Sequence, residues 1–109
     1  MDTETERTAR LFLKLVSDHY ELVGALLFGS RARHDGESDS DADIAVLLRG
    51  VPGARVVAAV AMAGIAFDVM LETGVLIDPV PLWEEEWNHP ERFRNPALIA
   101  NIRRDGVAM

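Results

Sequence analysis

The sequence of 109 residues contains no cysteine and only 11 Lys and Arg residues against 18 Asp and Glu, a formal net charge of −7. Without cysteine, the chain can form neither disulfide bonds nor thiolate zinc or iron–sulfur sites. Any metal must therefore be held by oxygen or histidine ligands, which favours a hard cation such as Mg²⁺. The shortage of basic residues argues against direct nucleic-acid binding, because phosphate contacts need clustered Lys and Arg.

Long hydrophobic runs and a targeting segment are also missing. The longest apolar stretch, from about Val56 to Phe67, is shorter than the roughly 20 residues that a membrane span needs. The N-terminus is polar and acidic, unlike a signal peptide. Hydrophobic residues make up 49% of the chain, which is enough for a packed core. We therefore expect a single cytoplasmic domain over residues 1–109, with no membrane partner.

Apolar periodicity predicts an α+β fold, a small mixed β-sheet of about four strands with helices packed on one face. Thr3 and Glu6 fit a capping box at the start of the first helix. Gly64 suits the position just past the end of a second helix. The segment 83–95 has no clear period and is expected to be irregular. The expected helices cover 3–20, 54–63 and 96–105, and the expected strands cover 22–28, 42–48, 65–71 and 75–80.

Three aspartates fall on expected strands. Asp41 and Asp43 are two residues apart, so their carboxylates share one face, with Cα atoms roughly 6.5–7 Å apart. A divalent cation is the usual reason for holding two like charges this close. Asp68 lies in the middle of the apolar 65–71 segment. If the two strands are adjacent, three carboxylates converge and suit two Mg²⁺ ions that clamp the oxygens of a phosphoryl transfer. A solvated acidic turn is the alternative.

A glycine–serine turn precedes the first two of these aspartates. Gly29 lets the backbone approach a ligand closely. Ser30 offers a hydroxyl and an N–H group, and a helical turn that begins there points free N–H groups at a phosphate. Arg31 and Arg33 add charge-assisted donors. The turn is thus a candidate anion-binding site, although a solvated turn would also explain Arg33.

The two motifs together resemble a known signature. Residues 27–33 (LFGSRAR) and 40–46 (SDADIAV) are similar to the motifs of the DNA polymerase β-like nucleotidyltransferase superfamily. The short chain resembles most the minimal nucleotidyltransferase (MNT) domain proteins, which act as antitoxins to HEPN-domain toxins. The closing segment 102–107 (IRRDGV) also resembles the usual tail of this group, which often has Glu where Asp105 stands. The resemblance implies the nucleotidyltransferase palm fold.

The resemblance also implies roles for the acidic residues. Asp41 and Asp43 would ligate both Mg²⁺ ions. Asp68 would ligate the ion that activates the acceptor hydroxyl and would assist its deprotonation. These three aspartates are the expected catalytic and metal-binding residues.

The remaining roles concern the nucleotide and the acceptor. Gly29 and Ser30 would hold the triphosphate, and Arg31 and Arg33 would steady its phosphates. ATP is the implied donor, and the products are an adenylylated hydroxyl and pyrophosphate. In the MNT group the acceptor is typically a Tyr of the HEPN toxin, so a HEPN-domain toxin is the expected partner.

Two other functions stay open. The chain could be a non-catalytic antitoxin that neutralises its toxin by binding alone. It could also modify a small-molecule hydroxyl, although aminoglycoside-modifying relatives carry a further acceptor domain and the segment after residue 82 is short for one. The helix at 54–63 is apolar nearly all round, so it is either buried or half-covered by another chain in a homodimer or hetero-oligomer. Trp83 and Trp87 either pack in the core or form a partner-binding patch.

Overall fold

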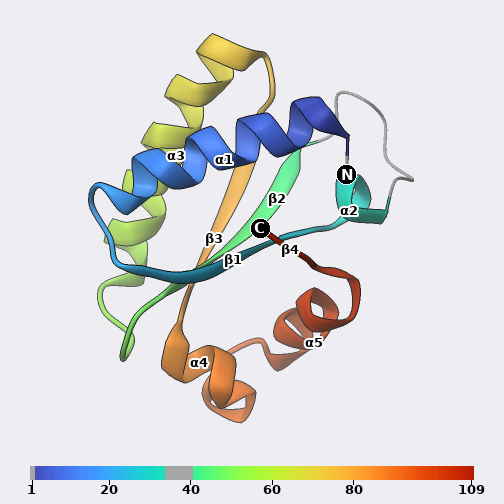
Figure 1. Cartoon of the computed structure of the whole chain (residues 1–109). Helices are drawn as coiled ribbons and strands as arrows, with labels where there is room; N and C mark the ends of the chain where they lie inside the picture. The colour runs from blue at the N-terminus through green and yellow to red at the C-terminus, as the bar shows by residue number, and fades with distance from the viewer. Residues whose placement is uncertain (1, 34–40) are drawn as a thin grey trace.

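The computed structural model describes residues 2–33 and 41–109, and the expectations for residues 34–40 lie outside this part of the chain. Its centre is a four-stranded sheet in the order β3-β2-β1-β4, with helices on both faces (Figure 1). The strands are β1 (Leu22–Phe28), β2 (Ala42–Leu48), β3 (Ile77–Trp83) and β4 (Val107–Ala108), and the helices are α1 (Thr3–Ser17), α2 (Ser30–Arg33), α3 (Arg55–Thr73), α4 (Glu84–Asn88), the 3₁₀ turn η1 (Pro90–Arg92) and α5 (Pro96–Asp105).

Helix α1 forms where the sequence predicts it, but its cap is one residue earlier than expected. The side chain of Asp2, and not Thr3, accepts a hydrogen bond from the backbone N–H of Thr5 at 2.7 Å. This bond satisfies one of the free N–H groups of the first turn. The buried side of the helix faces the sheet through residues at helical spacing, which are Ala9, Phe12 and Val16.

The sheet is mixed, as predicted. Strands β1 and β2 pair antiparallel, with Phe28 opposite Asp43. Strands β2 and β3 pair parallel, with Asp43 opposite Asp78, and the crossover between them is α3. Strand β4 is only two residues long and pairs with β1 opposite Leu26 and Leu27. The predicted fourth strand at 75–80 is thus β3, and the two-residue β4 was not predicted.

The predictions of a helix at 54–63 and a strand at 65–71 are wrong as separate elements, because one 19-residue helix, α3, spans both. Gly64 does not end this helix. Gly74 does, in the left-handed conformation (φ 78°) with its N–H donated to the carbonyl of Met70. The buried positions follow the helical period through both predicted segments, as Ala58, Met62, Ala66 and Val69.

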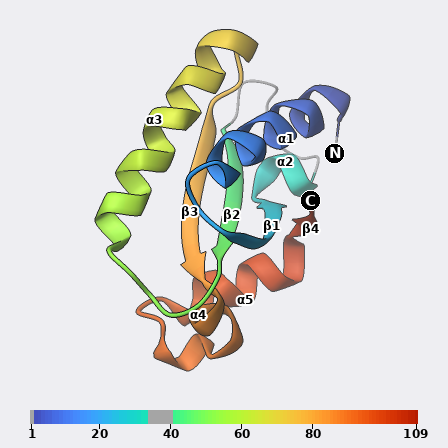
Figure 2. The same ribbon diagram turned by 60° about the vertical axis from the view of Figure 1, so that its left-hand side comes forward.

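Two apolar clusters lie on the two faces of the sheet. Alternate residues of β2 belong to different clusters. Ile44 and Val46 pack with α1 and α3. Ala45 and Leu47 pack with α5. The α+β class and the four-stranded mixed sheet are confirmed. Helices α1 and α3 cover one face as expected, and α5 adds cover on the other face (Figure 2).

The segment 83–95 is more ordered than the sequence suggested, since it contains α4 and the η1 turn. Trp83 is 7% exposed and packs in the α1–α3 cluster, whereas Trp87 packs in the α5 cluster. The guanidinium carbon of Arg103 stacks 4.2 Å from the Trp87 ring centroid. The two tryptophans therefore pack on opposite faces of the sheet and do not form one shared patch.

An ion pair connects the N-terminal end of α3 to the segment 83–95. Arg55 is paired with Glu86, whose side chain is only 8% exposed, and also donates to the carbonyl of Pro81 at 2.7 Å. Its guanidinium carbon lies 5.1 Å and 5.2 Å from the ring centroids of Trp83 and Phe93. Arg55 thus joins α3, the outer edge of β3 and α4.

Candidate active site

Gly29 and Asp43 meet at the end of β1. The pairing of Phe28 with Asp43 places the residue after Phe28 beside the Asp43 side chain. Gly29 has φ +76°, a conformation that other residues rarely adopt, and a Cβ atom there would overlap the Asp43 carboxylate, with Cγ only 3.2 Å away. Glycine is therefore required at position 29 both for its backbone conformation and for the space that Asp43 occupies.

Helix α2 begins at Ser30 and lies against the N-terminal part of α1. Nη1 of Arg31 donates to Oγ1 of Thr5 at 2.7 Å, and Thr5 is itself buried. Arg31 thus joins α2 to α1, a structural contact that the sequence did not suggest. The side chains of Ser30 and Arg33 lie outside the described part of the structure, so their phosphate contacts stay predictions, as does that of Arg31.

Asp41 and Asp43 lie where the sequence predicts them, at the start of β2. Asp41 is exposed, Asp43 is half-buried, and both precede the apolar part of the strand. The N–H of Ala42, between them, donates to the carbonyl of Leu76 at 2.9 Å and fixes the start of β2 beside the start of β3. Because this hydrogen bond fixes where β3 begins relative to β2, it determines which carboxylate of β3 lies near Asp41 and Asp43.

That carboxylate is Asp78 and not Asp68. Asp68 is exposed on α3, so the strand that was expected to carry it beside Asp43 does not exist. Asp78 is the direct partner of Asp43 in the β2–β3 ladder. Paired residues of neighbouring strands point to the same face, and the strands are roughly 4.8 Å apart, so these two side chains are neighbours.

Sequence reasoning missed Asp78 although a usable signal was present. Asp78 is also a lone acidic residue in an expected strand, 75–80, with apolar residues on both sides. Asp68 and Asp78 were therefore equivalent by local pattern. The length of α3 and the parallel register of β3 decide between them, and both depend on tertiary packing.

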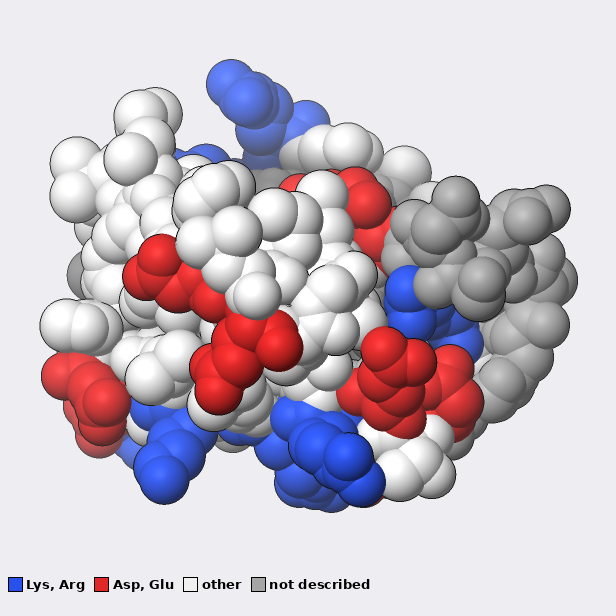
Figure 3. All heavy atoms as spheres, turned by 90° about the horizontal axis from the view of Figure 1, so that it is seen from above, with Lys and Arg blue, Asp and Glu red and all other residues white. Residues whose placement is uncertain are grey.

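A surface hollow of about 340 Å³ lies beside these carboxylates. Asp41 and Asp78 line one side of it, and α3 contributes Ala63, Ala66 and Phe67 to the other. Leu76, Ile77 and Pro79 also line it on the sheet side, so the hollow is apolar apart from the two aspartates. Figure 3 shows this end of the molecule from above, with acidic side chains separated by uncharged surface.

The donor set fits a hard cation, since the side chains of Asp43 and Asp78 offer carboxylate oxygens from the neighbouring strands β2 and β3. In residues 2–33 and 41–109, no three His, Asp or Glu side chains are close enough together to enclose a metal ion on their own. Mg²⁺ does not need such a cage, because it is usually held by one or two carboxylates, with substrate phosphates and water completing its shell.

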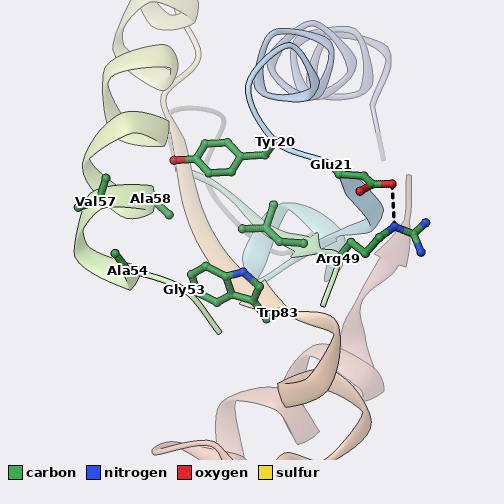
Figure 4. A pocket seen from close by; sticks show the side chains of 9 residues that line it. Tyr20, Glu21, Arg49, Gly53, Ala54, Val57, Ala58 and Trp83 are labelled. Atoms are coloured by element: carbon green, nitrogen blue, oxygen red, sulfur yellow. Dashed lines mark ion pairs between the residues drawn. The ribbon is translucent and has the colours of Figure 1, made fainter. Parts of the chain in front are cut away.

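A second hollow, of about 350 Å³, lies at the opposite end of the strands (Figure 4). Tyr20 and Trp83 form its aromatic wall, and Ala58 of α3 points toward them. Arg49 at its rim is paired with Glu21 at 2.8 Å. Among the described residues that line this hollow, Glu21 is the one carboxylate, so the paired carboxylates lie at the other end, with Gly29.

Comparison with known proteins agrees with this site. The profile of the family described as polymerase beta, nucleotidyltransferase, matches residues 13–77, more than half of the chain and a span that includes Gly29, Asp41 and Asp43. The chain belongs to the polymerase β nucleotidyltransferase family. Membership supports transferase activity in general terms.

Two solved structures share the fold of this nucleotidyltransferase. A protein from Sulfolobus solfataricus, assigned as a candidate nucleotidyltransferase, matches 99% of this chain and 87% of its own with a TM-score of 0.57 at 22% identity. A structure described as a toxin–antitoxin with AMP-PNP matches 94% of this chain and 70% of its own with a TM-score of 0.64 at 20% identity. A comparison with curated proteins gave no significant match.

Proposed function

We propose that this nucleotidyltransferase transfers AMP from ATP to a hydroxyl group of a partner protein, in a Mg²⁺-dependent reaction in the cytoplasm. The proposed partner is a HEPN-domain toxin, and the proposed acceptor is one of its tyrosines. The observation that supports the chemistry is the packing of the Asp43 carboxylate against Gly29, with Asp78 as its partner in the sheet. The observation that supports the partner is the similar fold of the toxin–antitoxin structure with AMP-PNP.

In the proposed reaction the acceptor oxygen attacks the α-phosphorus of ATP. The bond between that phosphorus and the oxygen bridging to the β-phosphate breaks, and pyrophosphate leaves with the electron pair of that bond. Bound Mg²⁺ would polarise the phosphate oxygens and offset the charge on the leaving group. Asp41 and Asp43, on one face of β2, are the proposed Mg²⁺ ligands, and Asp78 replaces Asp68 as the third.

The chain's own groups have separate tasks in this scheme. Gly29 leaves space for the Asp43 carboxylate and fixes its position. The Gly29–Ser30 turn is the proposed phosphate cradle, supported by its position at the end of β1 beside Asp43. Asp78 is exposed and lines the hollow, so it is the carboxylate best placed to take the proton of an incoming hydroxyl.

The test uses ATP labelled at the α-phosphate, Mg²⁺ and the protein encoded by the adjacent reading frame. We expect label on the partner protein, none when the γ-phosphate carries the label, and none when EDTA replaces Mg²⁺. Asp43→Asn should abolish transfer, whereas Asp18→Asn, an exposed carboxylate at the end of α1, should not change it. A stable complex without any label transfer would refute the proposed activity.

A second candidate is an antitoxin that acts by binding alone. The observation that favours it is the similar fold of the toxin–antitoxin structure, which a binding antitoxin would share whether or not it is catalytic. In that case the Asp41→Asn, Asp43→Asn double variant should still neutralise the toxin in cells. If neutralisation is lost while the complex still forms, the binding-only function is wrong.

A further inference from the structure

The outward side of α3 is an exposed apolar surface. Five of its large side chains are 53–75% exposed, and we call them the α3 stripe: Val56, Val57, Val60, Phe67 and Leu71. They repeat at intervals that return to one side of a helix, and a Cβ atom at Gly64, between Val60 and Phe67, would meet nothing within 4 Å. The stripe therefore has a continuous, shallow apolar surface with room for close approach of another helix.

The stripe is not needed for the core of this chain. The opposite side of α3 already packs on the sheet and α1 through Ala58, Met62, Ala66 and Val69. Figure 2 shows α3 at the margin of the molecule, and none of the other described helices and strands lies over its outward side. A surface helix normally places charged or polar residues there, so an apolar outward side marks an interaction surface.

The stripe is continuous with the candidate active site. Phe67 belongs to the stripe and also lines the hollow that contains Asp41 and Asp78. Ala63, one turn earlier on α3, lines the same hollow. A molecule seated along the stripe therefore reaches the hollow that Asp41 and Asp78 line.

Charge distinguishes between the occupants that an apolar helix could have. With 19 residues and a mean hydropathy of 1.8, α3 is long and apolar enough to cross a membrane, as the core helices of soluble proteins also can be. However, a helix bound at a membrane surface uses Lys and Arg to contact anionic lipid. The only basic residue of α3 is Arg55, which is paired with Glu86, whereas Asp68 and Glu72 are exposed beside the stripe.

The same charges disfavour a second copy of the chain. Each copy has a formal net charge of −7, and an α3–α3 contact offers no cation to Asp68 or Glu72. Like charges brought together at an interface weaken it. A fitting occupant is instead a different protein, with an apolar helix that has Lys or Arg where it passes these two carboxylates.

We propose that the α3 stripe docks a helix of the protein that accepts the nucleotidyl group, apolar on one side and basic at the end near Asp68 and Glu72. The docked helix places the acceptor hydroxyl at the hollow lined by Asp41 and Asp78. This inference rests on the proposed function for the acceptor reaction, but docking can be measured without catalysis.

The test compares two valine-to-glutamate variants with nearly equal exposure. Val60, on the stripe, is 67% exposed, and Val51, in the loop before α3, is 68% exposed. Both changes add one negative charge at an exposed position, so both variants should fold. The dissociation constant for the purified adjacent-frame protein should rise at least tenfold for Val60→Glu and stay within twofold for Val51→Glu. Glu72→Lys should slow association and reduce its dependence on salt.

Binding of Mg²⁺ and ATP, measured by calorimetry, provides the second readout and should be equal in all of these variants. Equal binding of the partner by Val60→Glu and Val51→Glu would overturn the docking proposal, even if label is transferred. So would a wild-type chain that does not bind the partner, or one that forms a stable homodimer which Val60→Glu dissociates. Stripe-dependent binding without label transfer would refute the proposed activity and leave the docking surface in place.

Discussion

The carboxylate of Asp43 occupies the space in which any residue but glycine would place a Cβ atom at position 29. This contact connects the two motifs of the site, because Gly29 directly follows β1 and Asp43 is the second residue of β2. Antiparallel pairing of the two strands creates it. Two features that looked like separate phosphate and metal elements in the sequence are therefore one packed unit.

Gly29→Ala should displace Asp43 and reduce nucleotidyl transfer by about 100-fold, since a shift of roughly 1 Å at a reacting site can cost that much. The measurement is the rate of α-phosphate label transfer with saturating ATP.

The matched control is Gly74→Ala. Gly74 has φ 78°, close to the 76° of Gly29, but a Cβ atom there meets nothing within 4 Å. Both variants should lose about 1–2 kcal/mol of unfolding free energy from the left-handed backbone. Only Gly29→Ala should also show the large loss of nucleotidyl transfer. Equal activity of the two variants would show that the Gly29–Asp43 contact has no role in the reaction.

Asp78→Asn should reduce nucleotidyl transfer by about 10²–10⁴-fold, the range for loss of a general base, whereas Asp68→Asn should change it less than about threefold. The reason is position: Asp78 pairs with Asp43 and lines the hollow, whereas Asp68 projects from α3. Both substitutions remove one charge at constant size, so each is the control for the other. A larger loss for Asp68→Asn would restore the assignment made from the sequence.

The sequence was sufficient for the parts of the fold that local chemistry determines. The strands at 22–28 and 42–48, the two faces of the second strand and the helix at 96–105 were predicted with nearly the observed bounds. The closeness of Gly29 to Asp43 was not predicted, because it depends on the antiparallel pairing of β1 with β2.

The rest of the fold depended on tertiary contacts. In the segment 65–71, Ile65, Phe67, Val69 and Leu71 alternate as in a strand, yet Val69 is buried and Phe67 exposed as α3 requires. A short apolar segment fits both periods, and Gly64 favoured the wrong one. The error led to Asp68 as the expected third carboxylate, whereas the structure places Asp78 beside Asp43. Packing against the sheet extends the helix as far as Gly74, so Asp68 lies on α3 and not on a strand.

Arg55→Ala should destabilise the fold by about 3 kcal/mol, because removing one partner leaves a buried charge on Glu86. This loss of unfolding free energy is at the lower end of the range for buried ion pairs, because the Arg55 side chain is 35% exposed. The loss should appear as a lower midpoint in urea denaturation with an unchanged slope.

Arg49→Ala is the matched control. Its partner is Glu21, and the two side chains are 56% and 70% exposed, so its removal should cost less than about 1 kcal/mol. If both arginine variants lose the same free energy of unfolding, the Arg55–Glu86 pair is not a special link between α3 and α4.

The cap of α1 should make stability depend on pH below 4. The N–H of Thr5, donated to the Asp2 carboxylate, holds the pKa of that carboxyl below its ordinary value of 3.8, and the charge of Arg31 acts in the same direction. A pKa that is lower in the folded state means that the stabilisation is complete above the unfolded pKa and is lost as the pH falls through the folded pKa.

Asp2→Asn separates this titration from the cap itself, because asparagine caps a helix about as well as aspartate but does not ionise there. The difference in unfolding free energy between wild type and Asp2→Asn should be constant from pH 7 to pH 5 and should shrink as the pH falls below 4. Asp2→Ala should cost about 1 kcal/mol at pH 7. Parallel stability curves for wild type and Asp2→Asn down to pH 3 would show that the Asp2 charge does not stabilise the helix.

Since Thr5 also receives the Arg31 hydrogen bond that joins α2 to α1, loss of the cap should also weaken ATP binding at the Gly29 turn.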